Sequence, residues 1–203
     1  MTLIDRAKNI IITPVKEWDV ISTETPDTGK IITGYVLPLA AAAAVAAFIG
    51  YGLIGQSVPF LGRVASTQVG IYYAVRVLIG AIAGVFIAAA IIDALAPSFG
   101  SEKNMGRSVQ LVAYSFTPAW IGGLLSIFPA LALIGALAGI YGLYLLYIGL
   151  PKLKKTPVDK HVGYFVVSLV VMIVVNFILF YLVELVLAPS LLDYGYNMDY
   201  RIR

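Results

Sequence analysis

Residues 110–150 read QLVAYSFTPAWIGGLLSIFPALALIGALAGIYGLYLLYIGL and contain no Asp, Glu, Lys or Arg. A helix that crosses a bilayer needs about 20 mostly apolar residues, so an uncharged run of roughly 40 is long enough for two such helices. Pro129 gives a natural point of division, because proline disfavours the helical conformation in the residue before it. The stretch therefore predicts two antiparallel membrane spans, at about residues 110–128 and 130–150, joined by a tight turn.

The remainder of the chain has the same apolar character. Of its 203 residues, 60% are hydrophobic and 12% are charged, whereas a soluble domain averages about 25% charged residues. Further apolar runs at about residues 35–55, 72–95 and 163–187 are each long enough to cross a membrane. The predicted fold class is therefore all-α, an integral membrane bundle of five transmembrane helices within residues 34–188.

The segment before the first span, residues 1–33, has an amphipathic pattern near its start. Polar residues fall on one helical face, and the apolar face consists of Leu3, Ile4, Ala7, Ile10 and Ile11. This spacing predicts a short amphipathic helix on the membrane surface, serving either as an interfacial anchor or as a docking site for a protein partner. After the last span, residues 189–203 are expected to form a short polar tail.

The distribution of Lys and Arg predicts the orientation in the membrane. With five spans and a cytoplasmic N-terminus, ten basic residues fall on the cytoplasmic side and three on the outer side, which fits the positive-inside rule. The ten are Arg6, Lys8, Lys16, Lys30, Lys103, Arg107, Lys152, Lys154, Lys155 and Lys160, and the three are Arg63, Arg201 and Arg203. We therefore expect a multi-pass protein of the cytoplasmic (inner) membrane with its N-terminus inside and its C-terminal tail outside.

The composition argues against several kinds of site. The chain has no cysteine and a single histidine, His161, which excludes a disulfide, a thiolate metal site and a two-histidine metal site within one chain. It has no phosphate-binding Gly-rich loop, no HExxH or GxSxG motif and no convergent acidic cluster, so we expect no enzyme activity, metal or cofactor. The basic residues lie between apolar runs and the net charge is only +3, which is typical of topology signals rather than of a nucleic-acid surface.

Charged and amide side chains inside the predicted spans are the candidate functional residues: Arg76, Asp93, Asn176 and Glu184. A charge within a bilayer costs several kcal/mol unless it is paired or hydrated. Arg76 and Glu184 lie at matching depths near the outer ends of two spans, and Asp93 lies level with Lys152 and Lys154 near the inner side, so an ion pair is geometrically allowed at each of the two levels. These pairs either stabilise the bundle or serve a function. For Asn176 we expect a hydrogen bond between helices.

Two small-residue motifs and a row of tyrosines complete the pattern. The pentapeptides at residues 80–84 and 135–139 both have the GxxxG spacing that lets helices approach closely, so the second and fourth spans either contact each other there or pack elsewhere. Tyr141, Tyr144 and Tyr147 recur every three residues, which is typical of an interfacial aromatic belt and is also compatible with a lipid-facing groove.

Several longer blocks have a recognisable order. They are Arg6-Ala-Lys8-Asn9 through Thr13-Pro14 and Glu17-Trp18; Gly34-Tyr35-Val36-Leu37-Pro38; Asp93-Ala-Leu-Ala-Pro-Ser-Phe-Gly100; Ala113-Tyr114-Ser-Phe-Thr-Pro118-Ala-Trp120; Tyr141-Gly-Leu-Tyr144-Leu-Leu-Tyr147; and Gly149-Leu150-Pro151. In these blocks the chain resembles the bacterial branch of the Yip-domain family, small five-span membrane proteins named for eukaryotic members that interact with Ypt/Rab GTPases. The resemblance covers nearly the whole chain, and Ser101 departs from it at a position where many relatives have a second glycine. It implies a five-helix domain with a cytoplasmic N-terminus, but it implies no mechanism, and a Rab partner is not carried over because the segment before the first span is short.

Two functions from different classes follow. The first is a non-enzymatic membrane scaffold or adaptor, which contacts the lipid bilayer and binds a protein partner through residues 1–21 and the basic inner loops. The alternative is an oligomeric transporter or channel for an ion, a small solute or a lipid, which would use the intramembrane charges. Five spans cannot form an even-numbered inverted repeat within one chain, so a transporter of that design would need a homo-oligomer to supply symmetry.

Overall fold

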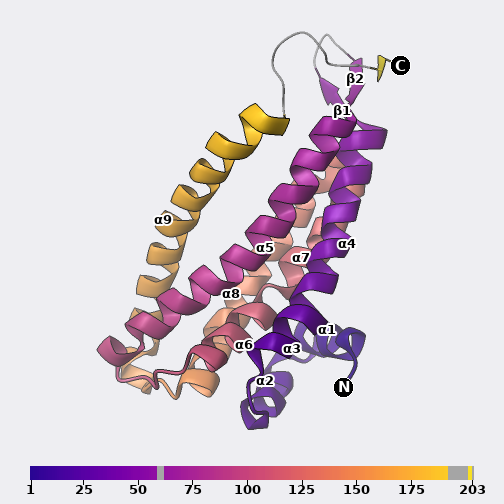
Figure 1. Ribbon diagram of the computed structural model, residues 1–203. Helices are drawn as coiled ribbons and strands as arrows, with labels where there is room; N and C mark the ends of the chain where they lie inside the picture. Colours follow the sequence, from indigo (N-terminus) through magenta and orange to yellow (C-terminus); the bar gives the residue numbers. More distant parts are fainter. Residues whose placement is uncertain (59–61, 192–200, 203) are drawn as a thin grey trace.

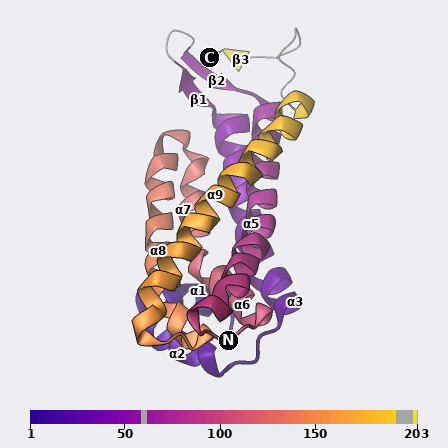
Figure 2. The same cartoon turned by 90° about the vertical axis from the view of Figure 1, so that its left-hand side faces the viewer.

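The computed structural model describes residues 1–58, 62–191 and 201–202. In this part the chain is almost entirely helical and forms an elongated bundle (Figures 1 and 2). The N-terminus lies at one end of the bundle and the C-terminal end of the chain at the other (Figure 1).

Four helices are long and apolar enough to cross a membrane, covering Thr28–Ile54, Thr67–Phe99, Pro129–Lys154 and Val158–Pro189. They coincide with four of the five predicted spans, so the prediction of a helical membrane bundle is confirmed at these places. The first consists of α3 (Thr28–Ile31), η1 (Ile32–Val36), α4 (Leu37–Ala47) and η2 (Phe48–Ile54), and the second of α5 (Thr67–Leu95) and η3 (Ala96–Phe99). The third ends with α8 (Ala132–Lys154), and the fourth belongs to α9 (Val158–Leu191).

These helices extend beyond the predicted limits. Helix α8 continues through Pro151 to Lys154, and α9 continues through Pro189 to Leu191. A proline within a membrane helix is tolerated where neighbouring groups compensate for the lost backbone hydrogen bond. At the start of the first span, the Asp27 side chain accepts a hydrogen bond from the Lys30 backbone N–H at 3.0 Å and so begins the helix several residues before the predicted position.

The predicted span at residues 110–128 is not one continuous helix, so a fifth membrane-spanning helix is not confirmed among the described residues. Helix α6 (Met105–Ser115) ends at Phe116, and it is followed by α7 (Thr117–Gly123) and the 3-10 turns η4 (Leu124–Ile127) and η5 (Pro129–Leu131). The break lies at Pro118, whose backbone cannot donate a hydrogen bond and whose ring clashes with the preceding turn. The Thr117 hydroxyl donates to the Tyr114 carbonyl at 2.7 Å and so satisfies a carbonyl at the end of α6.

The interrupted segment nevertheless runs alongside the first span for most of its length. At one end, a Cβ built on Gly106 would lie 3.2 Å from the Pro26 ring. At the other end, a Cβ built on Gly50 would lie 1.9 Å from the Ser126 carbonyl oxygen, so the two backbones touch there. Residues 106–126 thus extend from just before the start of the first span almost to its end, and α7 then turns back into α8 (Figure 2).

The segment between the first and second spans contains a small sheet. Strand β1 (Gln56–Val58) pairs antiparallel with β2 (Gly62–Ala65), which pairs antiparallel with β3 (Arg201–Ile202). Gly55 and Gly62 have φ values of +82° and +77°, which favour glycine, and they let the chain enter and reverse within this sheet. Most of the predicted tail, residues 192–200 and 203, lies outside the described residues.

The two GxxxG motifs do not meet each other. Gly80 and Gly84 of α5 face Phe180 and Asn176 of α9. Gly135 of α8 faces Gly122 of α7, and a Cβ there would lie 2.2 Å from the Gly122 carbonyl oxygen. Close packing therefore joins α5 to α9 and α8 to α7, so the hypothesis that the motifs join the second and fourth spans is wrong, and the alternative that they pack elsewhere is confirmed.

Candidate functional site

Two short helices, α1 (Leu3–Ile12) and α2 (Pro14–Thr23), pack against the end of the bundle where α8 turns into α9 (Figures 1 and 2). Helix α1 begins with a capping box, in which the Thr2 hydroxyl accepts from the Asp5 N–H and the Asp5 carboxylate accepts from the Thr2 N–H. Thr13-Pro14 then separates the two helices, with proline in the first turn of α2. The apolar face of α1 is divided: Ala7 and Ile10 are buried, whereas Ile4 and Ile12 are exposed.

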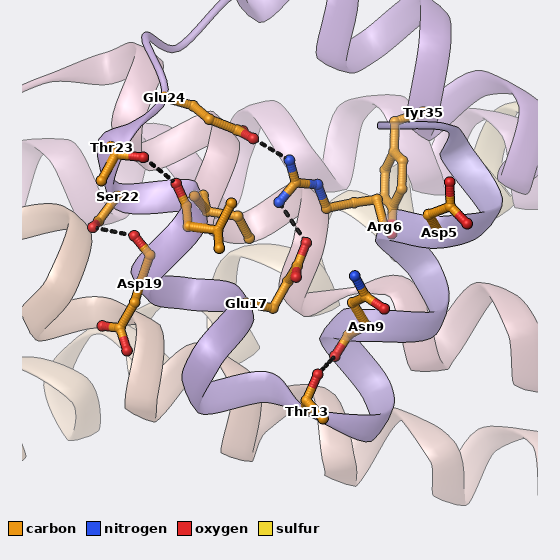
Figure 3. Close-up of polar contacts among 12 residues, drawn as sticks. Asp5, Arg6, Asn9, Thr13, Glu17, Asp19, Ser22, Thr23, Glu24 and Tyr35 are labelled. Carbon is orange, nitrogen blue, oxygen red and sulfur yellow. Dashed lines mark hydrogen bonds and ion pairs between the residues drawn. The ribbon is translucent and has the colours of Figure 1, made fainter.

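Arg6 holds the two helices together. Its side chain is only 8% exposed, although the helical pattern placed it on the polar face. One guanidinium nitrogen donates to the Glu17 carboxylate at 2.6 Å and the other to the Glu24 carboxylate, so the cation lies between two acids of α2 and its C-terminal cap (Figure 3). The guanidinium also lies 5.2 Å from the ring centroid of Tyr114. A buried cation with this many partners ties α1, α2 and α6 into one unit.

An aromatic cluster lies directly beneath this ion pair. The Tyr114 ring contacts Tyr35 edge-on at 4.9 Å and Trp18 at 6.4 Å between ring centroids. The Tyr35 and Thr117 hydroxyls share a hydrogen bond of 2.7 Å, and Trp120 lies 6.5 Å from Tyr35. Trp18 is fully buried. Aromatic pairs of this kind add specific geometry to the packing of apolar surface.

Gly149 makes room for this cluster on α8. A Cβ built on Gly149 would lie 2.6 Å from the Trp18 ring, so only glycine lets α2 approach α8 this closely. Of the motif residues singled out in the sequence, Tyr114, Trp120 and Gly149 thus meet in one place, with Pro118 buried at the start of α7 beside them. Sequence reasoning did not select Arg6, Glu17 or Glu24 as site residues, because partners eleven and eighteen residues apart across a proline turn produce no helical periodicity.

A second polar network joins α5, α6 and α8 near the same end. The Lys154 ammonium is fully buried and donates to the Asp93 carboxylate at 2.8 Å, to the Ser108 hydroxyl at 2.8 Å and to the Asn104 carbonyl at 3.1 Å. Asp93 in turn accepts from the Asn104 backbone N–H at 2.7 Å. The predicted pairing of Asp93 is therefore made by Lys154.

Lys152, the other predicted partner of Asp93, points elsewhere. It donates to the Val15 carbonyl at 2.9 Å and pairs with Asp19 of α2. Because successive helical residues are about 100° apart, Lys152 and Lys154 face nearly opposite sides of α8. The two lysines therefore serve different contacts, one within the bundle and one to α2.

The predicted Arg76–Glu184 ion pair is present at the opposite end of the bundle, between α5 and α9. The two side chains lie 3.0 Å apart and each is about one third exposed. Glu184 also accepts a hydrogen bond from the Tyr72 hydroxyl, and the Arg76 guanidinium lies 5.3 Å from the Phe180 ring centroid. Asn176 differs from expectation, because its amide nitrogen donates to the Met172 carbonyl of its own helix at 2.8 Å rather than to another helix.

The remaining motif residues lie along α8. Tyr144 is exposed and stacks on Tyr141, whose hydroxyl donates to the Ile11 carbonyl of α1 at 2.8 Å. Tyr147 stacks on His161 of α9 at 4.3 Å between ring centroids, and His161 bonds the Tyr147 carbonyl. Pro151 lies within α8. These residues do not join the Arg6 cluster, although Tyr141 supports α1.

The three polar networks join helices through ion pairs and hydrogen bonds. Across the part of the chain that the structure describes, no group of three or more His, Cys, Asp or Glu side chains is arranged to hold a metal ion. Each ionised group in the three networks has an oppositely charged partner within hydrogen-bonding distance.

The fold and these networks define a class: a multi-pass helical membrane protein with a pair of short helices locked onto one end of its bundle. The family model for the Yip1 domain matches residues 8–182, and the chain belongs to this family. It is 27% identical over 189 residues to the inner membrane protein YohC of Escherichia coli strain K12, an alignment that covers 91% of this chain and 93% of that protein. YohC of E. coli strain CFT073 gives the same identity and coverage. No solved structure matches.

Proposed function

We propose that this Yip1-family chain is a non-enzymatic membrane scaffold or adaptor that binds a protein partner through its two N-terminal helices. The observation that carries this proposal is the way α1 and α2 are held. Their inner faces are fixed by Arg6 and Trp18, whereas Ile4, Ile12, Val15 and Val20 remain exposed on the outside. A rigid helical pair with exposed apolar side chains suits recognition of a partner helix or surface.

The same proposal includes a topology. We place α1 and α2 on the cytoplasmic side of the inner membrane and the C-terminal tail outside, with α6, α7 and η4 together forming a fifth crossing. The excess of basic residues at the end that carries α1 and α2 supports this orientation. The inner membrane is the location given in the name of the E. coli relative YohC. The length over which residues 106–126 follow the first span supports the fifth crossing.

Site-specific photo-cross-linking in cells tests the docking role. A benzoylphenylalanine placed at Ile12, which is 65% exposed on α1, is expected to give a discrete protein adduct. The control position is Leu133, which is 75% exposed on α8 and is expected to face lipid. Glu17→Gln, which loosens the hold on Arg6, should weaken the Ile12 adduct. The same adducts at both positions, or adducts with lipid alone at Ile12, would contradict the adaptor role.

A transporter is the second candidate, and one observation favours it. On α9, the residues facing α5 include Tyr164, Ser168, Asn176 and Glu184 at spacings of four and eight, so a polar row follows this helix interface. The Ser168 hydroxyl is buried without a hydrogen-bond partner among the described residues. A chain of polar groups through a membrane is a feature of ion and proton pathways.

Flux measurements separate the two candidates. If the chain is a transporter, proteoliposomes that contain it should show flux of a substrate or of protons, and this flux should be lost in Asp93→Asn or Glu184→Gln. The flux should also depend on formation of a homo-oligomer. If the chain is an adaptor, the parent chain and both variants should show no more flux than empty liposomes. The Ile12 adduct should then be retained in both variants. Loss of flux with an unchanged adduct in the Glu184→Gln variant would favour the transporter.

A further inference from the structure

A polar pocket of about 250 Å³ lies beside α1, between α1, the start of the first span and α6. Its walls include Arg6, Glu24, Asp27, Lys30, Gln110 and Tyr114. Figure 3 shows the Arg6 side chain between Glu24 and Tyr35, and Tyr35 also lines the pocket. Lys30 and Asp27 lie 3.6 Å apart with largely exposed side chains, so both can turn toward a ligand.

Two hydrogen-bond donors in this pocket have no protein partner. Tyr114 is 7% exposed and Gln110 is 1% exposed, and both line the pocket. The Gln110 side-chain oxygen accepts from Arg107 at 3.0 Å, but within residues 1–58, 62–191 and 201–202 neither the Gln110 amide nitrogen nor the Tyr114 hydroxyl bonds to another group. Both donor atoms are accessible from the pocket, so they are placed to bind a ligand that has acceptor oxygens.

An apolar groove of about 370 Å³ lies on the other side of Leu3, which lines both spaces. Its walls come from α1 through Ile4, Ala7 and Ile11, and from the bundle through Leu39 and Ile121. Leu39 follows Gly34, a residue of the polar pocket, by more than one helical turn along the first span. The groove therefore lies deeper along that span than the polar pocket does.

We propose that the pocket and the groove together bind one phospholipid with a primary ammonium in its headgroup, that is, an ethanolamine phospholipid. The phosphate accepts hydrogen bonds from Tyr114, Gln110 and Lys30, and an acyl chain passes Leu3 into the apolar groove. The order of the two spaces, polar at the start of the span and apolar deeper, is the order of headgroup and acyl chain in a bilayer.

The charges around the pocket favour the zwitterionic headgroup over an anionic one. Among the side chains that line the pocket, Arg6 and Lys30 are the two cations and Glu24 and Asp27 are the two carboxylates, so the two signs of charge balance. A headgroup that carried only negative charge would offer no donor to the two carboxylates. A primary ammonium can donate to Glu24 and Asp27 at the same time as its phosphate accepts from the other groups.

Titration of the delipidated, detergent-purified chain with defined lipids, followed by native mass spectrometry, tests the site. Phosphatidylethanolamine should form a one-to-one adduct that is at least several-fold stronger than those of phosphatidylglycerol and phosphatidylcholine. Soluble glycerophosphoethanolamine should bind much more weakly, because it lacks the acyl chain. Tyr114→Phe should weaken the phosphatidylethanolamine adduct about tenfold, which corresponds to one lost hydrogen bond to a charged group.

Matched variants keep the result interpretable. Tyr114→Phe removes a hydroxyl that has no protein partner, so its unfolding midpoint should equal that of the parent chain. Tyr144→Phe removes a hydroxyl from an exposed position on α8 and should leave lipid binding unchanged. Lys30→Gln, at an exposed position, should weaken the adduct without affecting folding. Equal binding of the three lipids, equal binding of the glycerol compound, or no difference between Tyr114→Phe and Tyr144→Phe would overturn the proposal.

Discussion

Lys154 is a buried charge whose ammonium is fully hydrogen-bonded by Asp93, Ser108 and the Asn104 carbonyl. Removing one partner of a buried ion pair leaves the other charge without compensation and costs about 3–5 kcal/mol. Lys154→Met is therefore expected to lower the free energy of unfolding by about 3 kcal/mol or more. Denaturant unfolding of the purified chain in detergent measures this change.

The neighbouring lysine provides the control. Lys155 is 78% exposed and pairs with Glu102 at 2.8 Å, so Lys155→Met should change the unfolding free energy by at most about 1 kcal/mol. Combining Lys154→Met with Asp93→Asn should recover part of the loss, because no isolated charge remains. Equal effects of the two lysine variants would show that Lys154 does not have the role given to it here.

Gly149 is the residue on which the approach of α2 to α8 depends, because a Cβ there would overlap the Trp18 ring. Gly149→Ala is expected to displace Trp18 and to lower the free energy of unfolding by about 1–3 kcal/mol, the usual cost of overpacking. Gly139→Ala on the same helix is the matched control, since its nearest neighbour would be Ala119 at 3.9 Å. The unfolding midpoint and the near-ultraviolet circular dichroism of the two variants make the comparison, and a larger effect for Gly139→Ala would refute the packing described.

Single residues also show which contacts could be predicted from the sequence and which could not. The depth of each charge along its span was enough to allow a pair between Arg76 and Glu184 and a pair between Asp93 and a lysine after the fourth span, and the structure contains both pairs. Choosing between Lys152 and Lys154 needs the direction of each side chain, which depends on α8 continuing through Pro151. Arg6 was placed on a polar face by periodicity, and only the contact with α2 makes that face an interior one.

At the scale of elements, α1 and α2 form one unit because Arg6 bridges them. Arg6→Met leaves Glu17 buried without its cation, so both helices should loosen from the bundle while the spans remain folded. Hydrogen–deuterium exchange is expected to accelerate in residues 3–23 and to remain unchanged in residues 67–95. Lys8→Met, which changes an exposed residue of the same helix, is the control, and unaltered exchange in the Arg6 variant would contradict the bridging role.

Helices could be predicted from the sequence where the length of an apolar run is enough to determine a membrane span. Four spans coincide with four long apolar helices, because a run of that length has few alternatives to helix in a bilayer. The 110–128 segment has the same composition but contains Pro118, and its backbone breaks into α6 and α7 there. The sheet of β1, β2 and β3 joins residues far apart in the chain, and no local pattern in residues 56–70 indicates that pairing.

At the scale of the whole molecule, the candidate site arises from three distant parts of the chain. The N-terminal helices, the start of the first span and the α6–α7 break meet around Tyr114 and Tyr35. The sequence supplied the motif blocks, but their separation along the chain concealed that Arg6, Trp18 and Gly149 contact one another through this cluster. The packing of α7 against both α4 and α8 is what brings them together.

The proposed cytoplasmic position of α1 and α2 and the proposed fifth crossing underlie the functional proposals, and cysteine labelling measures both. Because the chain contains no cysteine, Ser57→Cys, Lys103→Cys and Lys155→Cys each introduce one thiol at an exposed position. A membrane-impermeant maleimide applied to intact spheroplasts should label the cysteine at 57 and should reach those at 103 and 155 only after the membrane is permeabilised. Labelling of the cysteine at 155 from outside would mean that residues 105–127 do not cross the membrane, and protection of the cysteine at 57 would mean that the orientation is reversed.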